Sequence, residues 1–255
     1  MTELENFCRD SPQMAKRLAA ELVRMADVHS DASVDDIELS LVFPIYNEEE
    51  SIPELYRRVT EVIGQSNVRS AEIIFVNDGS RDRSEELVRE LRTTDARVKL
   101  VNFSRNFGHQ AAITAGIDHS RGAATILMDA DLQHPAELVP RMLEAWVAGA
   151  DMVCARRASR ADESWLKRFG THAFYSIVNA NSHVQIPDDA GDFRLMDRRV
   201  VDALNALPER NRFMKGLFAW VGFNSVGVPY ERPQRAAGTT KFNFWRLWNF
   251  ALDGV

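Results

Sequence analysis

Residues 71–91 read AEIIFVNDGSRDRSEELVREL and hold the unit from which the fold is predicted. The first six residues, AEIIFV, are mostly apolar, which is typical of a buried strand. Asn77-Asp78-Gly79-Ser80 is a turn sequence that ends this strand. Ser80 is predicted to cap a helix that runs to about Leu91. The stretch therefore predicts one strand–turn–helix unit.

The same alternation continues on both sides of this unit. Further strands are predicted at residues 37–43, 98–103, 124–128 and 151–155, with helices between them. Strands separated by helices of about 10 to 15 residues indicate parallel βαβ units. Shorter strands are predicted at 191–196 and 226–230. The predicted fold class is α/β, with a mostly parallel central sheet and helices on both faces, and ligands are expected beyond the carboxyl ends of the strands.

Composition excludes several classes of protein. The 255 residues are 45% apolar and 27% charged, with a net charge of −6, which argues against a protein that coats nucleic acid. The two cysteines lie far apart without a CxxC pair, which favours a reducing compartment and argues against structural zinc. No run of about 18 apolar residues predicts a transmembrane helix. The acidic first residues do not resemble a signal peptide.

Acidic residues follow two of the predicted strands. Asp129 and Asp131 come directly after residues 124–128, and two carboxylates at this spacing can share a divalent cation. Gln133 can complete the oxygen ligands of Mg²⁺ or Mn²⁺, although a solvated loop with a helix cap is the alternative. Asp78 can accept a hydrogen bond from a base or a ribose, or can belong to an ordinary turn. The sequence lacks GxxxxGK[ST], GxGxxG, GxSxG and HExxH motifs.

Several separated motifs resemble those of a known family. PIYNEEE at 44–50, VNDGSRDRS at 76–84 and DADLQHP at 129–135 resemble the family 2 inverting glycosyltransferases, which implies a GT-A-type nucleotide-sugar-binding fold. RNFGHQAAITAGIDHSRG at 105–122, GDFRLMDRR at 191–199, RPQRAAGTTKF at 232–242 and WNFALDG at 248–254 are similar to the polyprenyl-phosphate sugar transferases. These include bactoprenol glucosyltransferases and dolichol-phosphate mannose synthases. The resemblance covers residues 38–255.

The resemblance implies a role for individual residues. Those implied to hold the nucleotide base and ribose are Pro44, Tyr46, Glu48 and Asp78. Those implied to hold Mg²⁺ or Mn²⁺ on the donor diphosphate are Asp129, Asp131 and Gln133. Those implied to contact donor or acceptor phosphate are Arg156, Arg168, Arg235 and Lys241. Which of Arg156, Arg157 and Arg168 acts stays open, and a solvated or structural ion pair is the alternative for each.

The chemistry of the acceptor decides what Asp192 must do. A hydroxyl acceptor needs a general base, whereas a phosphomonoester, with a second pKa of about 6, is already mostly a dianion. We therefore predict that Asp192 is important for catalysis without having to accept a proton, and that it positions the acceptor or pairs with Arg194. Asp131, Arg235 and Lys241 are the other predicted catalytic residues, and Arg194 is also predicted to bind substrate. His109 and His134 are predicted to be polar residues without a catalytic role.

These inferences predict metal-dependent inverting transfer of glucose from UDP-glucose to undecaprenyl or dolichyl phosphate at the cytoplasmic face of the membrane. The alternatives are transfer to a saccharide hydroxyl, for which Asp192 would be a true base, and a nucleotide-sugar-binding protein without turnover. Residues 1–36 are predicted to form a helical extension that packs on the main domain or on a neighbouring subunit of a homo-oligomer. Residues 37–241 form the predicted catalytic domain. Residues 242–255 are predicted to be an amphipathic helix on the membrane surface, just before transmembrane helices of the longer family members, and a helix packed onto the domain is the alternative.

Overall fold

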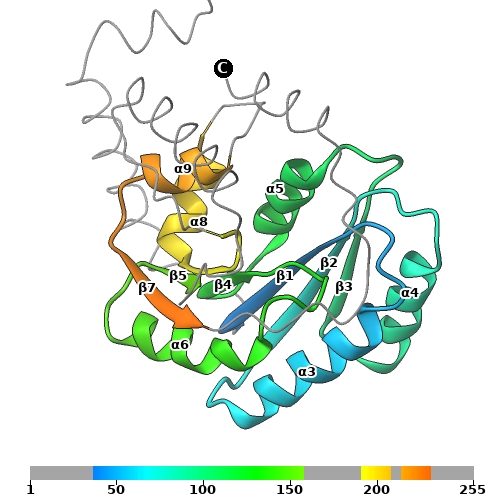
Figure 1. The fold of residues 1–255 in the computed structure, drawn as a ribbon, viewed down its shortest axis with the longest axis horizontal. Coiled ribbons are helices and arrows are strands. Elements are labelled where there is room, and N and C mark those ends of the chain that lie inside the picture. The colour runs from blue at the N-terminus through cyan, green and yellow to red at the C-terminus, as the bar shows by residue number, and fades with distance from the viewer. Residues whose placement is uncertain (1–36, 158–190, 208–213, 231–255) are drawn as a thin grey trace, which may run out of the picture.

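The computed structural model describes residues 37–157, 191–207 and 214–230. Seven strands form one sheet in the order β3-β2-β1-β4-β6-β5-β7 (Figure 1). The strands are β1 (Leu39–Ile45), β2 (Ala71–Asn77), β3 (Val98–Asn102), β4 (Ala124–Leu127), β5 (Met152–Arg157), β6 (Arg194–Asp197) and β7 (Ser225–Tyr230). The predictions for residues 1–36 and 242–255 lie outside the described residues and stay predictions.

One strand of the sheet runs against the others. β1 pairs in parallel with β2 and β4, β2 with β3, and β5 with β7, whereas β6 is antiparallel to both β4 and β5. The predicted α/β class with a mostly parallel sheet is therefore confirmed. Because β6 is reversed, it begins at the edge of the sheet where the other strands end. This reversal brings the residues before Arg194 to the carboxyl edge.

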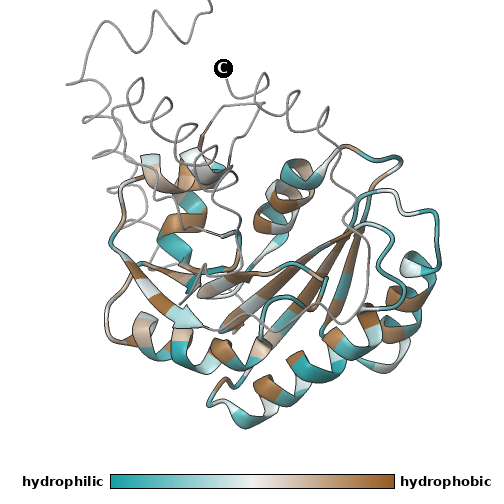
Figure 2. Cartoon of the chain, in the orientation of Figure 1, coloured by the Kyte–Doolittle hydropathy of each residue, from teal (hydrophilic) through white to brown (hydrophobic). Residues whose placement is uncertain are grey.

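Helices cover both faces of the sheet (Figure 1). The helices are α3 (Ile52–Gln65), α4 (Ser84–Thr94), α5 (His109–His119), the short 3₁₀ helix η2 (Ala136–Leu138), α6 (Val139–Val147), α8 (Arg198–Asn205) and α9 (Met214–Trp220). Helices α3, α4 and α6 pack on one face, and α5, α8 and α9 pack on the other. The strands are mostly apolar, whereas α3, α4 and α6 carry both apolar and polar residues (Figure 2).

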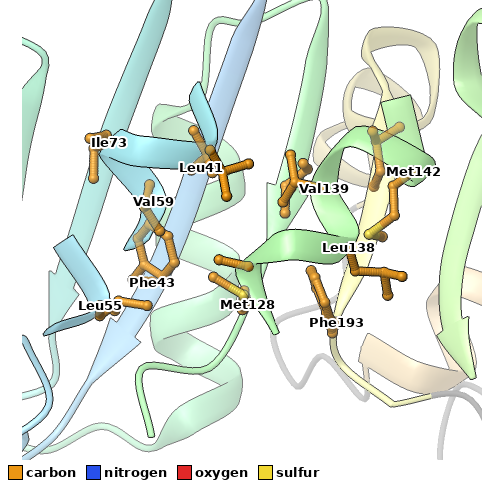
Figure 3. Packing of buried hydrophobic residues seen from close by; sticks show 14 of the residues in the cluster. Leu41, Phe43, Leu55, Val59, Ile73, Met128, Leu138, Val139, Met142 and Phe193 are labelled. Carbon is orange, nitrogen blue, oxygen red and sulfur yellow. The ribbon is translucent and has the colours of Figure 1, made fainter. Parts of the chain in front are cut away.

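The alternation of side chains along each strand divides the core into two layers. Phe43 and Phe75 belong to the layer under α3, with their ring centroids 5.4 Å apart, while Val42 and Ile74 belong to the layer under α5. In the first layer Phe193 packs beside Met128 and Leu138 (Figure 3). The residue before β6 is therefore anchored in the core at the end of β4.

One predicted helix start is wrong in detail. Ser80 does not cap a helix: its hydroxyl accepts a hydrogen bond from the backbone N–H of Asn47, and α4 begins only at Ser84. Ser80 thereby joins two strand-end loops, a long-range role that local sequence does not reveal. After Pro135 the chain forms η2 as a 3₁₀ turn and becomes α-helical at Val139.

A buried glutamate fastens the opposite, amino edge of the sheet. Glu72 is 1% exposed and accepts hydrogen bonds from the Ser40 hydroxyl at 2.5 Å, the backbone N–H of Arg121 at 2.7 Å and the ammonium of Lys99. Burial alone would raise the pKa of Glu72, but these hydrogen bonds lower it below its ordinary value of 4.5. The ionised carboxylate is therefore the form that the fold stabilises.

Replacing Glu72 with glutamine is expected to lower the free energy of unfolding by about 2 kcal/mol at pH 7. The pKa is lower in the folded state, so the contribution of ionised Glu72 is complete above pH 4.5 and is lost as the pH falls through the folded-state pKa. Urea titrations at pH 7 and below pH 4 should show the difference shrinking in acid. The control is Glu61→Gln, which removes an exposed ion pair with Arg57. A difference that did not change with pH would contradict this account.

Candidate active site

The predicted site residues gather at the carboxyl edge because of how β4 and β6 pair. Leu127, the last residue of β4, lies opposite Arg194, the first residue of β6. Asp129 lies two residues after Leu127 in the chain, and Asp192 lies two residues before Arg194. Phe193 is fully buried and holds the backbone next to Asp192 in place. Two acids that are 63 positions apart in the chain are thus brought to one place by strand pairing.

An imidazole lies between these two carboxylates. His109 Nε2 is 3.6 Å from Asp129 Oδ1 and 3.5 Å from Asp192 Oδ2. The His109 side chain is 45% exposed and that of Asp192 is 15% exposed, so the group borders the open edge of the sheet. Sequence reasoning gave His109 no role here. The GHQ sequence at the start of α5 was the available signal, but only the fold shows what faces it.

Asp78 holds the start of α5 in place. Its carboxylate is 3% exposed and accepts hydrogen bonds from the backbone N–H groups of Phe107 at 2.7 Å and Gly108 at 3.0 Å. A carboxylate at a helix N-terminus satisfies backbone donors that have no partner within the helix. The next residue, Gly79, has φ of 68°, and a Cβ there would lie 2.5 Å from the backbone of Arg105. Asp78 therefore has a structural role that the sequence prediction did not include.

The first strand end is joined to the turn after β2. Asn47 has φ of 55° and its side-chain carbonyl accepts a hydrogen bond from the N–H of Arg81 at 2.8 Å. Glu48 accepts a hydrogen bond from the Ser51 hydroxyl at 2.6 Å. Tyr46 is 40% exposed, whereas Pro44 is buried inside β1. Of the three residues predicted here to hold a nucleotide, Tyr46 presents the largest open surface.

The turn after β4 carries the oxygen atoms that were predicted to bind a metal. Asp131 is exposed and accepts a hydrogen bond from the N–H of Gln133 at 3.1 Å, and Leu132 between them has φ of 60°. Gln133 is 6% exposed, and its amide oxygen has no hydrogen-bond partner among the described residues. A buried carbonyl oxygen without a donor, close to two carboxylates in sequence, fits a cation that prefers oxygen ligands.

The described residues contain no group of three His, Cys, Asp or Glu side chains able to hold a metal ion. A magnesium site at a nucleotide does not require one, because such sites use one or two carboxylates together with substrate phosphates and water. The side chains of Asp129, Asp131 and Gln133 therefore fit a metal that arrives with a diphosphate. They do not fit a metal site made by the protein alone.

Asp129 has a second imidazole contact. His134 Nε2 lies 3.3 Å from Asp129 Oδ2, and on the other side of the ring His134 Nδ1 lies 3.3 Å from the hydroxyl of Tyr230. His134 was predicted to be a polar residue with its hydrogen bonds satisfied, and these contacts agree with that description. Tyr230 ends β7 and was not among the predicted site residues. Nothing in its local sequence connects it with a residue 96 positions earlier.

The predicted arginines have different environments. Arg156 is exposed at the end of β5 and lies over Gly227 of β7, where a Cβ would lie 2.5 Å from its Cδ. Arg194 is 2% exposed, donates to the carbonyl of Gly191 at 2.7 Å, and lies 3.6 Å over the ring of Phe218. Arg168, Arg235 and Lys241 lie outside the described residues, so their predicted roles stay predictions.

Burial explains the character of Arg194. It lowers the pKa of the guanidinium below its ordinary value, and nearby Cys154 and Asp192 oppose this effect. The guanidinium donates to the carbonyl of Gly191 and so supports the turn that carries Asp192. The predicted pairing of Arg194 with Asp192 and its predicted place at the substrate stay predictions.

Comparison with known proteins agrees with this architecture. Residues 40–204 match glycosyl transferase family 2. An uncharacterised glycosyltransferase of Synechocystis sp. is 48% identical over 219 residues, covering 86% of this chain and 69% of that protein. A protein of Shigella phage SfX named bactoprenol glucosyl transferase is 47% identical over 219 residues, covering 86% of this chain and 72% of its own length.

Among solved structures, a mannosyltransferase from Pyrobaculum calidifontis in complex with GDP-Man and Mn²⁺ has the same fold. Its TM-score is 0.52 at 16% identity, and the match covers 94% of this chain and 69% of that one. The fold is therefore that of the GT-A glycosyltransferases. No helix in the described part of the chain has the length and apolar character needed to cross a membrane. The chain belongs to glycosyl transferase family 2 and is a glycosyltransferase.

Proposed function

We propose that the protein transfers a hexose, with inversion, from a nucleotide sugar to a polyprenyl phosphate, in a reaction that requires a divalent metal. The observation that carries the proposal is the meeting of Asp129 and Asp192 across the ends of β4 and β6, with His109 between them. Relatives named bactoprenol glucosyl transferase, at 46–47% identity, support a polyprenyl-phosphate acceptor and glucose as the sugar. UDP-glucose is the proposed donor.

Asp129, Asp131 and Gln133 are the residues proposed to hold Mg²⁺ or Mn²⁺ on the donor diphosphate. When bound, the ion neutralises negative charge that develops on the departing nucleotide diphosphate. The protein contributes the two carboxylates of the turn after β4 and a buried amide oxygen. Tyr46, Glu48 and Asp78 lie at the neighbouring strand ends, where the base and ribose are proposed to bind.

Asp192 is proposed to orient the acceptor rather than to remove its proton. The acceptor phosphate has a second pKa of about 6 and attacks as a dianion near neutral pH, so that no base is needed. His109 Nε2 lies 3.5 Å from Asp192 Oδ2, beside the proposed acceptor site. The reaction is proposed to take place at the cytoplasmic face of the membrane, with residues 242–255 on the membrane surface.

Asp192→Asn tests this role. It is expected to reduce kcat by less than about 100-fold, because general bases contribute about 10² to 10⁴ and none is required for a phosphate acceptor. UDP affinity should stay unchanged, and wild type and variant should share one pH–rate profile that follows the acceptor's second ionisation. The measurement is single-turnover transfer between pH 5 and pH 9, with Asp118→Asn at the far end of α5 as the control.

Comparison of acceptors completes the test. Polyprenyl phosphate should be glycosylated, whereas the matching polyprenol and free saccharides should not. Transfer to a saccharide hydroxyl, with a loss of several orders of magnitude in Asp192→Asn, would instead identify Asp192 as a base and the enzyme as a polysaccharide-forming transferase. Binding of UDP without turnover on any acceptor would indicate a nucleotide-sugar-binding protein.

A further inference from the structure

A line of three side chains connects the end of β7 to Asp129. The hydroxyl of Tyr230 lies 3.3 Å from His134 Nδ1, and His134 Nε2 lies 3.3 Å from Asp129 Oδ2. When the imidazole is neutral, the tyrosine donates to Nδ1 and the Nε2–H group donates to the carboxylate. The two hydrogen bonds thereby fix one tautomer and one ring orientation.

Tyr230 and Asp129, the two ends of this line, differ in how deeply they are buried. Tyr230 is 8% exposed and belongs to the core layer on the α3, α4 and α6 face of the sheet, as does Phe193, whose ring centroid is 5.2 Å from that of His134. The His134 side chain is only 12% exposed. Asp129, by contrast, has a side chain that is 31% exposed at the open edge of the sheet. The core therefore gives Oδ2 of this carboxylate a fixed partner, while the more exposed His109 faces Oδ1.

We propose that His134 and Tyr230 are positioning residues, which hold the Asp129 carboxylate in the orientation that binds the metal–nucleotide complex. This inference rests on the proposed function, since it assigns Asp129 to the metal. Asp129 Oδ2 accepts from His134 and Oδ1 lies 3.6 Å from His109 Nε2, and each oxygen keeps a further lone pair for a cation. Residues that orient a metal ligand in this way typically change metal affinity by about 10- to 100-fold when they are replaced.

Tyr230→Phe removes only the hydroxyl and keeps the ring in the core. It is expected to weaken Mn²⁺ binding in the presence of UDP about tenfold, and His134→Ala about 10- to 100-fold. His134→Gln, which keeps an N–H donor, should recover part of the loss. UDP affinity in EDTA should stay at the wild-type value in all three variants. Electron paramagnetic resonance of Mn²⁺ titrated into the full chain measures binding without turnover.

Tyr56→Phe is the matched control, because Tyr56 also donates its hydroxyl to a carboxylate, that of Asp95 at 2.8 Å, but on α3 away from the strand ends. It should leave Mn²⁺ affinity unchanged. The pulsed spectrum of wild type should show no nitrogen bonded to Mn²⁺, because His134 contacts the carboxylate and not the ion. A directly bonded nitrogen that disappears in His134→Gln would overturn the positioning role and make His134 a ligand.

Two further outcomes separate this inference from the proposed function. If wild type binds Mn²⁺ with UDP and the Tyr230 and His134 variants bind it equally well, the positioning role is wrong and the metal-dependent reaction stands. If wild type binds no Mn²⁺ with UDP, the metal site itself is wrong, and the inference fails with it. Thermal melting in EDTA checks that Tyr230→Phe folds like wild type.

Discussion

Replacing Asp131 with asparagine is expected to reduce sugar transfer by about 10³-fold or more. The metal proposed at this residue contributes several kcal/mol to neutralising the leaving diphosphate, and each 1.36 kcal/mol corresponds to a factor of ten in rate. Asp131 is exposed, and the substitution preserves its shape, so the free energy of unfolding should change little. Initial rates at saturating donor and acceptor, with Mg²⁺ and with Mn²⁺, measure the effect.

Asp118→Asn provides the comparison for Asp131→Asn. Asp118 is also an exposed acid, but it lies near the carboxyl end of α5, at the opposite end of that helix from His109. It should keep the wild-type rate. Wild-type activity in Asp131→Asn would contradict the assignment of the DxD turn to the metal, and so would wild-type activity in excess EDTA.

Replacing Asp78 with alanine is expected to lower the free energy of unfolding by about 3 kcal/mol in the absence of any nucleotide. The substitution leaves the backbone N–H groups of Phe107 and Gly108 without their charged acceptor, in a place where Asp78 is 3% exposed. It also releases the start of α5, so that His109 is no longer held beside Asp129 and Asp192. Nucleotide affinity and transfer should therefore fall together with stability.

Urea unfolding without ligand, followed by UDP titration of the folded variant, separates these effects. Asp118→Ala on the same helix should unfold close to the wild-type midpoint. An Asp78→Ala protein with wild-type stability and weakened UDP binding would show that the carboxylate serves the nucleotide alone. That result would contradict the structural role assigned to it here.

Local sequence was sufficient to predict most of the sheet. The apolar run at residues 71–76 and the turn sequence after it predict β2 and its end correctly, because both depend on side-chain periodicity and turn chemistry within about ten residues. The reversed direction of β6 could not be predicted in this way. It depends on which neighbours Arg194 finds across the sheet, namely Leu127 and Cys154.

In the candidate site, too, some residues could be predicted from local motifs and others depend on distant neighbours. Asp129, Asp131 and Asp192 were predicted as site residues because they lie in motifs that resemble those of the family, and their roles stay predictions. His109 and His134 were given no catalytic role and Tyr230 was not singled out, because each acquires its place from a partner far away in the sequence. The role of Asp78 was predicted only in part for the same reason. A residue at a strand end can contact a ligand, a loop or both, and only the fold distinguishes them.

The most direct test of the central claim is a two-phase transfer assay. Radiolabelled nucleotide sugars are incubated with the full chain, a short polyprenyl phosphate and Mg²⁺ or Mn²⁺, and the label is counted after extraction into organic solvent. We expect label from UDP-glucose in the organic phase, dependent on the metal and abolished by EDTA. Absence of organic-phase label with every nucleotide sugar tested, by a protein that is folded, would contradict the proposed activity.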